Sequence, residues 1–149
     1  MTRTSQILFQ LLLLLAIASI TLNSCEKQRP DGDWDPMKWN DESGLAQVDN
    51  VYQVPASGGT YKFHCTNYSA FWISSIEEDG ELIMPSVDNN DWKDLSGQWT
   101  HVQCLADGDL VVTFEPLSFY SSASKRTMNL CVTAGVFYSF RFVQNNNAN

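Results

Sequence analysis

Apolar and polar residues alternate along much of this chain with the two-residue period of β-strands. The pattern is clearest near the C-terminus, where the segments 127–133 and 136–144 each place their apolar residues on a single face. These residues are Met128, Leu130 and Val132 in the first segment, and Val136, Tyr138, Phe140 and Phe142 in the second. Ala134 and Gly135 between the segments favour a turn, so a terminal β-hairpin is predicted.

Further strands are predicted at 48–54, 60–66, 71–76, 99–105 and 110–115. Clusters of Gly, Pro, Asn and Asp separate these segments, and the spacing of apolar residues that is typical of helices is absent. We therefore expect an all-β fold, an immunoglobulin-like antiparallel β-sandwich of about seven strands over residues 48–144. A disordered tail is expected at 145–149.

The N-terminal apolar run, residues 7–20, follows Arg3 and leads into Leu22-Asn23-Ser24-Cys25. This arrangement is typical of a bacterial lipoprotein signal peptide, residues 1–24, with cleavage before a lipidated Cys25. The predicted location is the outer membrane of the cell envelope, with the N-terminal lipid as the anchor. Two alternatives remain open. One is a transmembrane helix, although the run is shorter than the about 20 residues needed to cross a bilayer, and the other is a secretory signal cut elsewhere.

Residues 25–47 contain prolines, aspartates and glycines without apolar periodicity, and they are predicted to form an acidic linker. The linker also carries Trp34, Met37 and Trp39. We expect these side chains to fold back over an edge or end of the sandwich, since large apolar groups are rarely left in a free tether. Recognition of a partner by the same side chains is the alternative.

The precursor has a net charge of −8, and loss of Arg3 with the signal peptide makes the mature chain −9. This charge argues against nucleic acid or an anionic lipid surface as a partner. We predict no metal site. The spacing of Asp31, Asp33 and Asp35 is similar to that of a calcium loop, but Pro36 stands where such a loop needs glycine.

Four stretches in a characteristic order carry a family resemblance: VPASGGTYKF at 54–63, FWI at 71–73, Lys125-Arg126 before a strand, and FRFVQ at 140–144. Together they resemble a BACON domain, a Bacteroidetes-associated module often found at the N-terminus of carbohydrate-active proteins. The resemblance implies a seven-stranded immunoglobulin-like sandwich in a Bacteroidetes envelope protein. It also implies a role in holding glycans or mucin.

The sequence favours a protein that is not an enzyme and needs no cofactor. His64 and His101 fall on the polar faces of their strands, where solvated histidines are the ordinary case. The acidic residues of 77–81 lie at a predicted hairpin tip, where hydration would keep them all ionised and leave no raised pKa for a general acid. No catalytic residue is therefore predicted.

Aromatic residues in polar loop sequence are the best candidates for ligand binding, because sugar rings stack their apolar faces on indole and phenol rings. The predicted ligand-binding residues are Trp92, Trp99, Phe119 and Tyr120. Trp72 is expected in the core, and an inward position for Trp99 is the alternative. Two functions remain open. One is binding of glycans or mucin, and the other is a structural or assembly role with envelope proteins only, similar to a fimbrial subunit.

Geometry distinguishes these two functions. Convergence of Trp92, Trp99 and Tyr120 on one exposed face would favour glycan binding. Scattered or buried rings beside an open sheet edge would favour a protein partner that adds a strand.

Three cysteines remain after lipidation, an odd number for an oxidising compartment. Strand phase places Cys65 and Cys104 on apolar faces, so we expect both in the core, where a disulfide between them is one option. Cys131 shares its face with polar residues.

Overall fold

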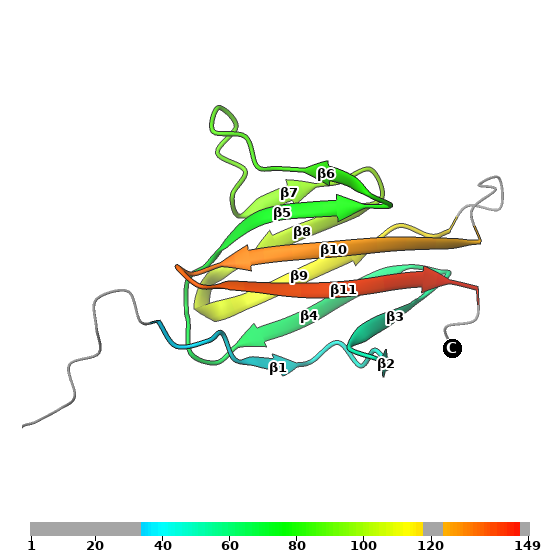
Figure 1. Cartoon of the computed structure of the whole chain (residues 1–149), viewed down its shortest axis with the longest axis horizontal. Coiled ribbons are helices and arrows are strands. Elements are labelled where there is room, and N and C mark those ends of the chain that lie inside the picture. The colour runs from blue at the N-terminus through cyan, green and yellow to red at the C-terminus, as the bar shows by residue number, and fades with distance from the viewer. Residues whose placement is uncertain (1–33, 118–123, 147–149) are drawn as a thin grey trace, which may run out of the picture. The chain divides into compact units, whose positions relative to one another are not determined.

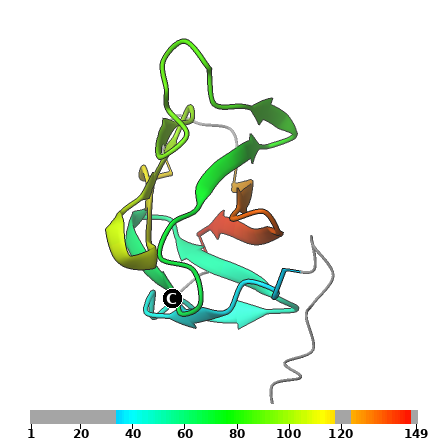
Figure 2. The same ribbon diagram turned by 90° about the vertical axis from the view of Figure 1, so that its left-hand side faces the viewer.

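The computed structural model describes residues 34–117 and 124–146, which form two β-sheets packed face to face (Figures 1 and 2). The five-stranded sheet has the order β1 (Trp39–Asp41), β4 (Gly59–Cys65), β9 (Asp109–Phe114), β8 (Thr100–Cys104) and β7 (Asp94–Ser96). The six-stranded sheet has the order β2 (Gln47–Val48), β3 (Val51–Pro55), β11 (Phe137–Asn145), β10 (Lys125–Thr133), β5 (Trp72–Glu78) and β6 (Glu81–Ile83). A single 3-10 turn, η2 (Ala106–Gly108), joins β8 to β9 among the described residues. The all-β sandwich is confirmed.

Eleven strands are present among the described residues, where about seven were expected, and two further details differ from the expectation. The predicted strand 48–54 is a hairpin, in which Asp49 and Asn50 form the turn between β2 and β3 with φ values of 52° and 61°. A two-residue turn with positive φ at both positions favours Asn, Asp and Gly, and the alternation of apolar residues does not report it. In addition, β3 runs parallel to β11, so the six-stranded sheet is mixed rather than wholly antiparallel.

The core consists of the inward faces of both sheets and is rich in aromatic rings. Its largest fully buried members include Phe63, Phe71, Phe140, Phe142, Ile73, Ile76, Leu110, Met128 and Leu130. Phe63 of one sheet lies 5.0 Å from Phe140 of the other, between ring centroids. Burial of each such side chain contributes about 1.5–3 kcal/mol relative to exposure, so the contacts between the two inward faces supply much of the favourable free energy of packing.

The segment that begins at Trp34 belongs to the sandwich, so the domain starts earlier than the predicted boundary at 48. β1 pairs with β4, and Met37 is only 5% exposed. Trp39 packs edge-on against Phe71 and Phe140, with ring centroids 5.2 and 4.9 Å away. The prediction that these apolar side chains cover a sheet edge is confirmed for Met37 and Trp39. The predicted signal peptide, Cys25, residues 26–33 of the predicted linker and residues 147–149 of the predicted tail lie outside the described residues.

The side chain of Gln144 links the end of β11 by hydrogen bonds to the segments that follow β3 and β9. Its side chain is fully buried, and its amide Nε2 donates hydrogen bonds to the carbonyl oxygens of Glu115, Pro55 and Ala56 at 2.9, 3.2 and 3.4 Å. The bonds to Pro55 and Ala56 reach the turn after β3, and the bond to Glu115 reaches the residue that follows β9. The prediction of a disordered tail at 145–149 is therefore wrong at Asn145, which is the last residue of β11.

The three cysteines of the described region are free. Cys65 and Cys104 are buried, as predicted, but they form no disulfide with each other. Burial raises the pKa of the Cys104 thiol to about 12. Cys131 is half-buried on the outer face of the six-stranded sheet.

This difference in burial predicts the order in which the thiols react. Because thiolate is the reacting form, iodoacetamide at about pH 8 is expected to alkylate Cys131 in the folded protein while Cys104 and Cys65 stay protected until unfolding. Peptide mass spectrometry of protein treated with and without urea measures this order. Modification of Cys104 at the same rate as Cys131 in the native protein would contradict the packing described above.

Candidate functional site

Trp92 and Trp99, the two predicted ligand-binding residues that the structure describes, do not come together. The backbone of Trp92 lies beside the start of β5, where its carbonyl accepts a hydrogen bond from the N–H of Ile73 at 2.7 Å. The backbone of Trp99 lies at the other end of the same strand, where its N–H donates to the Glu78 carboxylate at 3.4 Å. Five residues of strand separate these ends by about 17 Å. Phe119 and Tyr120 lie outside the described residues.

Trp99 is also not presented on a loop. Its side chain is 8% exposed and packs against Phe114 with ring centroids 6.1 Å apart. The guanidinium of Arg126 lies over the indole, 5.3 Å from its centroid. Trp99 is therefore an inward residue in the turn immediately before β8, which corrects the prediction of a presented ring in favour of the inward alternative.

Three other exposed rings lie at the end of the sandwich that carries the turn between β10 and β11. This end is on the left of Figure 1 and toward the viewer in Figure 2. Trp34, Trp72 and Phe137 are 57%, 44% and 68% exposed, and we call these three residues the aromatic surface. Thr133 of β10 faces Trp72 on one side and Phe137 on the other in the strand register. Residues directly opposite one another project from the same face of a sheet, so both rings lie on the outer face of the six-stranded sheet.

The structure corrects the expected core position of Trp72. Its neighbours Phe71 and Ile73 are almost completely buried, at 1% and 0% exposed, whereas Trp72 is 44% exposed. Strand alternation turns the indole between them outward.

Trp34 joins the aromatic surface by packing on Gly135 in the hairpin turn. The two carbons shared by the indole rings, Cδ2 and Cε2, lie 3.4 Å from the position that a Cβ atom would take at Gly135. Gly135 has a φ of +94°, a conformation that residues with a side chain rarely adopt. The bare glycine therefore leaves room for the indole to rest on the turn, and more than half of Trp34 stays open to solvent.

Next to the aromatic surface, the start of β11 is packed against other aromatic side chains. Tyr138, the residue after Phe137, contacts Trp39 and Phe140 with ring centroids 5.6 and 4.9 Å away. Burial raises the pKa of the Tyr138 hydroxyl. Because Tyr138 packs on Trp39 and Phe140, the start of β11 is held against the core, and Phe137 is presented from a strand rather than from a loop.

One sequence signal could have pointed to this surface. Phe137 occupies the polar phase of β11, the phase shared by Ser139 and Arg141. A large aromatic residue in the polar phase of a strand points away from the core, so beside a hairpin turn it is expected to be exposed to solvent. No comparable signal exists for the grouping of Trp34 and Trp72 with it, because that grouping depends on which strands are neighbours.

Polar side chains continue the same outer face next to the aromatic surface. The next row across the strands contains Ser75, Cys131 and Ser139, and the row after it contains Glu77, Asn129 and Arg141. Glu77 accepts a hydrogen bond from the Asn129 amide at 3.4 Å. The face therefore changes along the strands from rings to hydroxyls and then to charges and amides.

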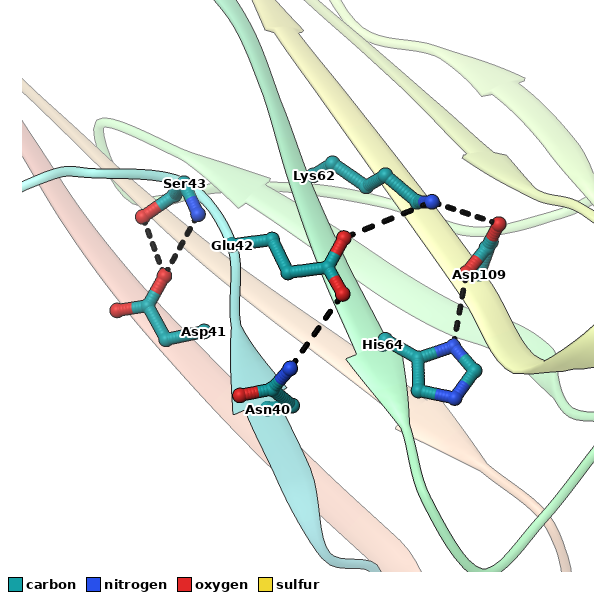
Figure 3. A network of polar contacts seen from close by, with 7 residues as sticks. All are labelled: Asn40, Asp41, Glu42, Ser43, Lys62, His64 and Asp109. Atoms are coloured by element: carbon teal, nitrogen blue, oxygen red, sulfur yellow. Dashed lines mark hydrogen bonds and ion pairs between the residues drawn. The ribbon is translucent and has the colours of Figure 1, made fainter.

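The outer face of the five-stranded sheet is polar and paired within itself (Figure 3). Nδ1 of His64 lies 2.8 Å from the Asp109 carboxylate. Lys62 places its ammonium 3.0 Å from Asp109 and 3.5 Å from Glu42. The hydrogen bond from His64, followed by that from Lys62, lowers the pKa of Asp109 below its ordinary value.

A second pair of the same kind lies two strands away. His101 Nε2 lies 2.6 Å from Asp94, and the Gln103 amide donates to the same carboxylate at 2.8 Å. These two bonds lower the pKa of Asp94, with His101 the larger cause. Within residues 34–117 and 124–146, neither His64 nor His101 hydrogen-bonds a serine, threonine or cysteine, and no three His, Cys, Asp or Glu side chains are grouped as metal ligands would be.

Replacement of His64 by alanine is expected to raise the pKa of Asp109 toward its usual value, because it removes the main hydrogen bond to the carboxylate. The folded pKa lies below the unfolded one, so the pair stabilises the fold at higher pH, and its contribution is lost as the pH falls through the folded value. NMR titration of the Asp109 carboxyl measures the shift, with Asp94 as the internal control. An Asp109 pKa that does not move in the variant would contradict the assigned cause.

The predicted hairpin tip is present, but one of its carboxylates is not hydrated. Asp79 and Gly80 form the turn between β5 and β6 with φ values of 50° and 90°. Glu78, immediately before the turn, is only 2% exposed. Its carboxylate accepts hydrogen bonds from the backbone N–H of Gln98 at 2.7 Å and from the hydroxyl of Thr100 at 2.5 Å. The arrangement joins the β5–β6 hairpin to the turn between β7 and β8.

A helix with the length and apolar composition needed to cross a membrane is not found in the described part of the chain.

Comparisons with known proteins place the chain beside one solved structure. No protein-family model matches the chain, and a search of curated proteins found no match. The NMR structure of a protein from Bacteroides thetaiotaomicron is 32% identical, with a TM-score of 0.61. The match covers 82% of this chain and 97% of that one. With this identity over nearly the whole length of the relative, the chain belongs to the same family as the Bacteroides thetaiotaomicron protein.

Proposed function

We propose that this protein is a lipid-anchored envelope protein that binds glycans through the aromatic surface without catalysing a reaction. The signal peptide ending before Cys25 supports the anchor, and the resemblance to a BACON domain supports a glycan or mucin ligand. The observation that carries the proposal is the joint exposure of Trp34, Trp72 and Phe137 at one end of a rigid sandwich.

Physical chemistry favours a sugar as the occupant of this surface. Exposed aromatic rings that lie together signal a binding site more strongly than single exposed apolar residues do. A pyranose offers an apolar face of C–H groups to each ring and hydroxyls around its edge. The adjacent row of Ser75 and Ser139 provides hydroxyl partners for that edge.

One observation favours the structural alternative. Among the described residues, β6 is an edge strand of the six-stranded sheet, and it leads into a loop that projects from the sandwich in Figures 1 and 2. Leu82, Met84 and Val87 along this edge and loop are 60%, 64% and 77% exposed. The separation of Trp92 from the buried Trp99 meets the condition that favours strand addition. A protein partner at β6 is therefore the second candidate function.

A glycan array tests the first proposal. Full-length protein in a non-glycosidic detergent is expected to bind at least one glycan class, and the double variant Trp72→Ala with Phe137→Ala is expected to lose that signal. Trp92→Ala is the matched control, because it removes a half-buried indole that is not one of the three residues of the aromatic surface. Absence of signal from folded wild-type protein, or equal signal from the double variant, would reject the proposal.

The anchor has its own test. Radiolabelled palmitate is expected to enter the protein in the producing bacterium and to be absent from a Cys25→Ala variant. Equal labelling of both would refute lipidation at Cys25 and leave the glycan proposal unaffected.

A further inference from the structure

The register of three neighbouring strands fixes how far apart two rings of the aromatic surface stand. Trp72 on β5 and Phe137 on β11 are both directly opposite Thr133 on β10. Neighbouring strands lie about 4.8 Å apart, so the backbones that carry the two rings are about 10 Å apart. The line from one ring to the other crosses the strands at a right angle.

Between the two rings, the side chain of Thr133 rises less far from the sheet than either ring does. Its side chain is much smaller than either ring, and its hydroxyl accepts a hydrogen bond from the N–H of Gly135 at 3.2 Å, which turns it toward the backbone of the hairpin. The row is therefore ring, gap, ring, with 44% of Trp72 and 68% of Phe137 open to solvent. A ligand that covers both rings has to bridge the gap.

We propose that the aromatic surface takes a linear, β-linked glycan that lies across the strands, with alternate sugars stacked on Trp72 and Phe137 and the intervening sugar above Thr133. This inference rests on the proposed function and narrows it to a ligand class. Pyranoses joined through equatorial bonds form an extended, flat chain whose repeat is close to half of the spacing between the rings. An α-1,4-linked chain curves away from such a row, whereas a linear β-linked chain keeps its alternate sugars in line.

The second row of the outer face runs parallel to the ligand. Ser75 and Ser139 lie in this row, on either side of Cys131. Two residues along a strand correspond to about 7 Å, a distance over which the hydroxyl at the edge of a stacked sugar meets a serine directly or through one water. Glu77 and Arg141 lie one row farther away, so an uncharged glycan is expected to suffice for binding.

The dependence of affinity on ligand length tests the geometry. Full-length protein in a non-glycosidic detergent is titrated calorimetrically with β-1,4-linked cello-, xylo- and chito-oligosaccharides from disaccharide to hexasaccharide, and with malto-oligosaccharides of the same lengths. For at least one β-linked series, affinity is expected to rise about tenfold between disaccharide and trisaccharide, the change that a second stacking contact of about 1.4 kcal/mol produces. Longer chains are expected to add little.

Variants separate this proposal from general glycan binding. Trp72→Ala is expected to remove the step at the trisaccharide and to change disaccharide affinity by less than about threefold, because a disaccharide still stacks on Phe137. Trp92→Ala is expected to keep the step, and unfolding in urea verifies that each variant is folded.

Binding of α-linked or branched glycans without a length step would overturn the linear ligand and leave glycan binding in place. Absence of binding to every oligosaccharide and to the glycan array would overturn both. Self-association that Phe137→Ala abolishes would also overturn the proposal, because the surface would then join two copies of the protein.

Discussion

Replacement of Glu78 by alanine is expected to lower the free energy of unfolding by about 3 kcal/mol. The carboxylate is almost completely buried and accepts hydrogen bonds from the Gln98 backbone N–H and the Thr100 hydroxyl, with a longer one from the N–H of Trp99. Alanine leaves these donors without an acceptor, and a buried donor that loses its partner costs about 1–3 kcal/mol. Urea denaturation followed by tryptophan fluorescence measures the loss.

The same hairpin supplies the control. Glu77 is the same residue type one position earlier, but its side chain lies on the outer face and makes a single 3.4 Å hydrogen bond with Asn129. Glu77→Ala is expected to change stability by about 0.5 kcal/mol or less. Glu78→Gln is expected to lie between the two alanine variants, because the amide keeps one acceptor oxygen. Equal effects of Glu77→Ala and Glu78→Ala would contradict a structural role for the buried carboxylate.

The hydrated tip expected from the sequence is wrong at Glu78 because of a bulge. The register of β5 against β10 shifts between Cys131 and Val132, where one extra residue of β5 is accommodated. Before the shift Ile73 points inward, and after it Ile76 and Glu78 do. Simple alternation would have put Glu77 on the face of Ile73 instead. A bulge changes the phase of every later residue, and the apolar pattern of so short a strand does not locate it.

Strands with an uninterrupted alternation were predictable. Residues 110–115 and 127–133 each have one apolar and one polar face, and the inward positions found for Leu110 and Met128 are those expected. The spacing of apolar residues did not predict the turn at Asp49 and Asn50 or the parallel pairing of β3 with β11. Both depend on backbone conformation and strand order, which the spacing of apolar residues does not encode.

The aromatic surface was beyond sequence reasoning for a similar reason. Its rings lie at positions 34, 72 and 137, and they reach the same end of the sandwich because β5 and β11 are both neighbours of β10 and because the segment before β1 rests on Gly135. The sequence instead favoured aromatic residues in polar loops, namely Trp92, Trp99, Phe119 and Tyr120. That criterion misses a ring in the polar phase of a strand, and Phe137 is such a ring.

Replacement of Trp39 by alanine is expected to lower the free energy of unfolding by about 3 kcal/mol, through lost burial and the cavity that remains. The indole contacts Phe71, Phe140 and Tyr138, and it closes the edge of the core beside β4. Trp39→Phe is expected to cost about 1 kcal/mol at most, because the indole Nε1 has no hydrogen-bond partner among the residues that the structure describes. Urea denaturation of both variants gives the difference.

Trp34 provides the matched control, since it lies in the same N-terminal segment but is 57% exposed. Trp34→Ala is expected to change stability by about 0.5 kcal/mol. If the segment were a free linker, Trp39→Ala and Trp34→Ala would have equally small effects. A large loss at Trp39 together with a small one at Trp34 would instead mean that one short segment both completes the core and presents a ring, so that a mutation can remove the proposed binding residue while the fold remains.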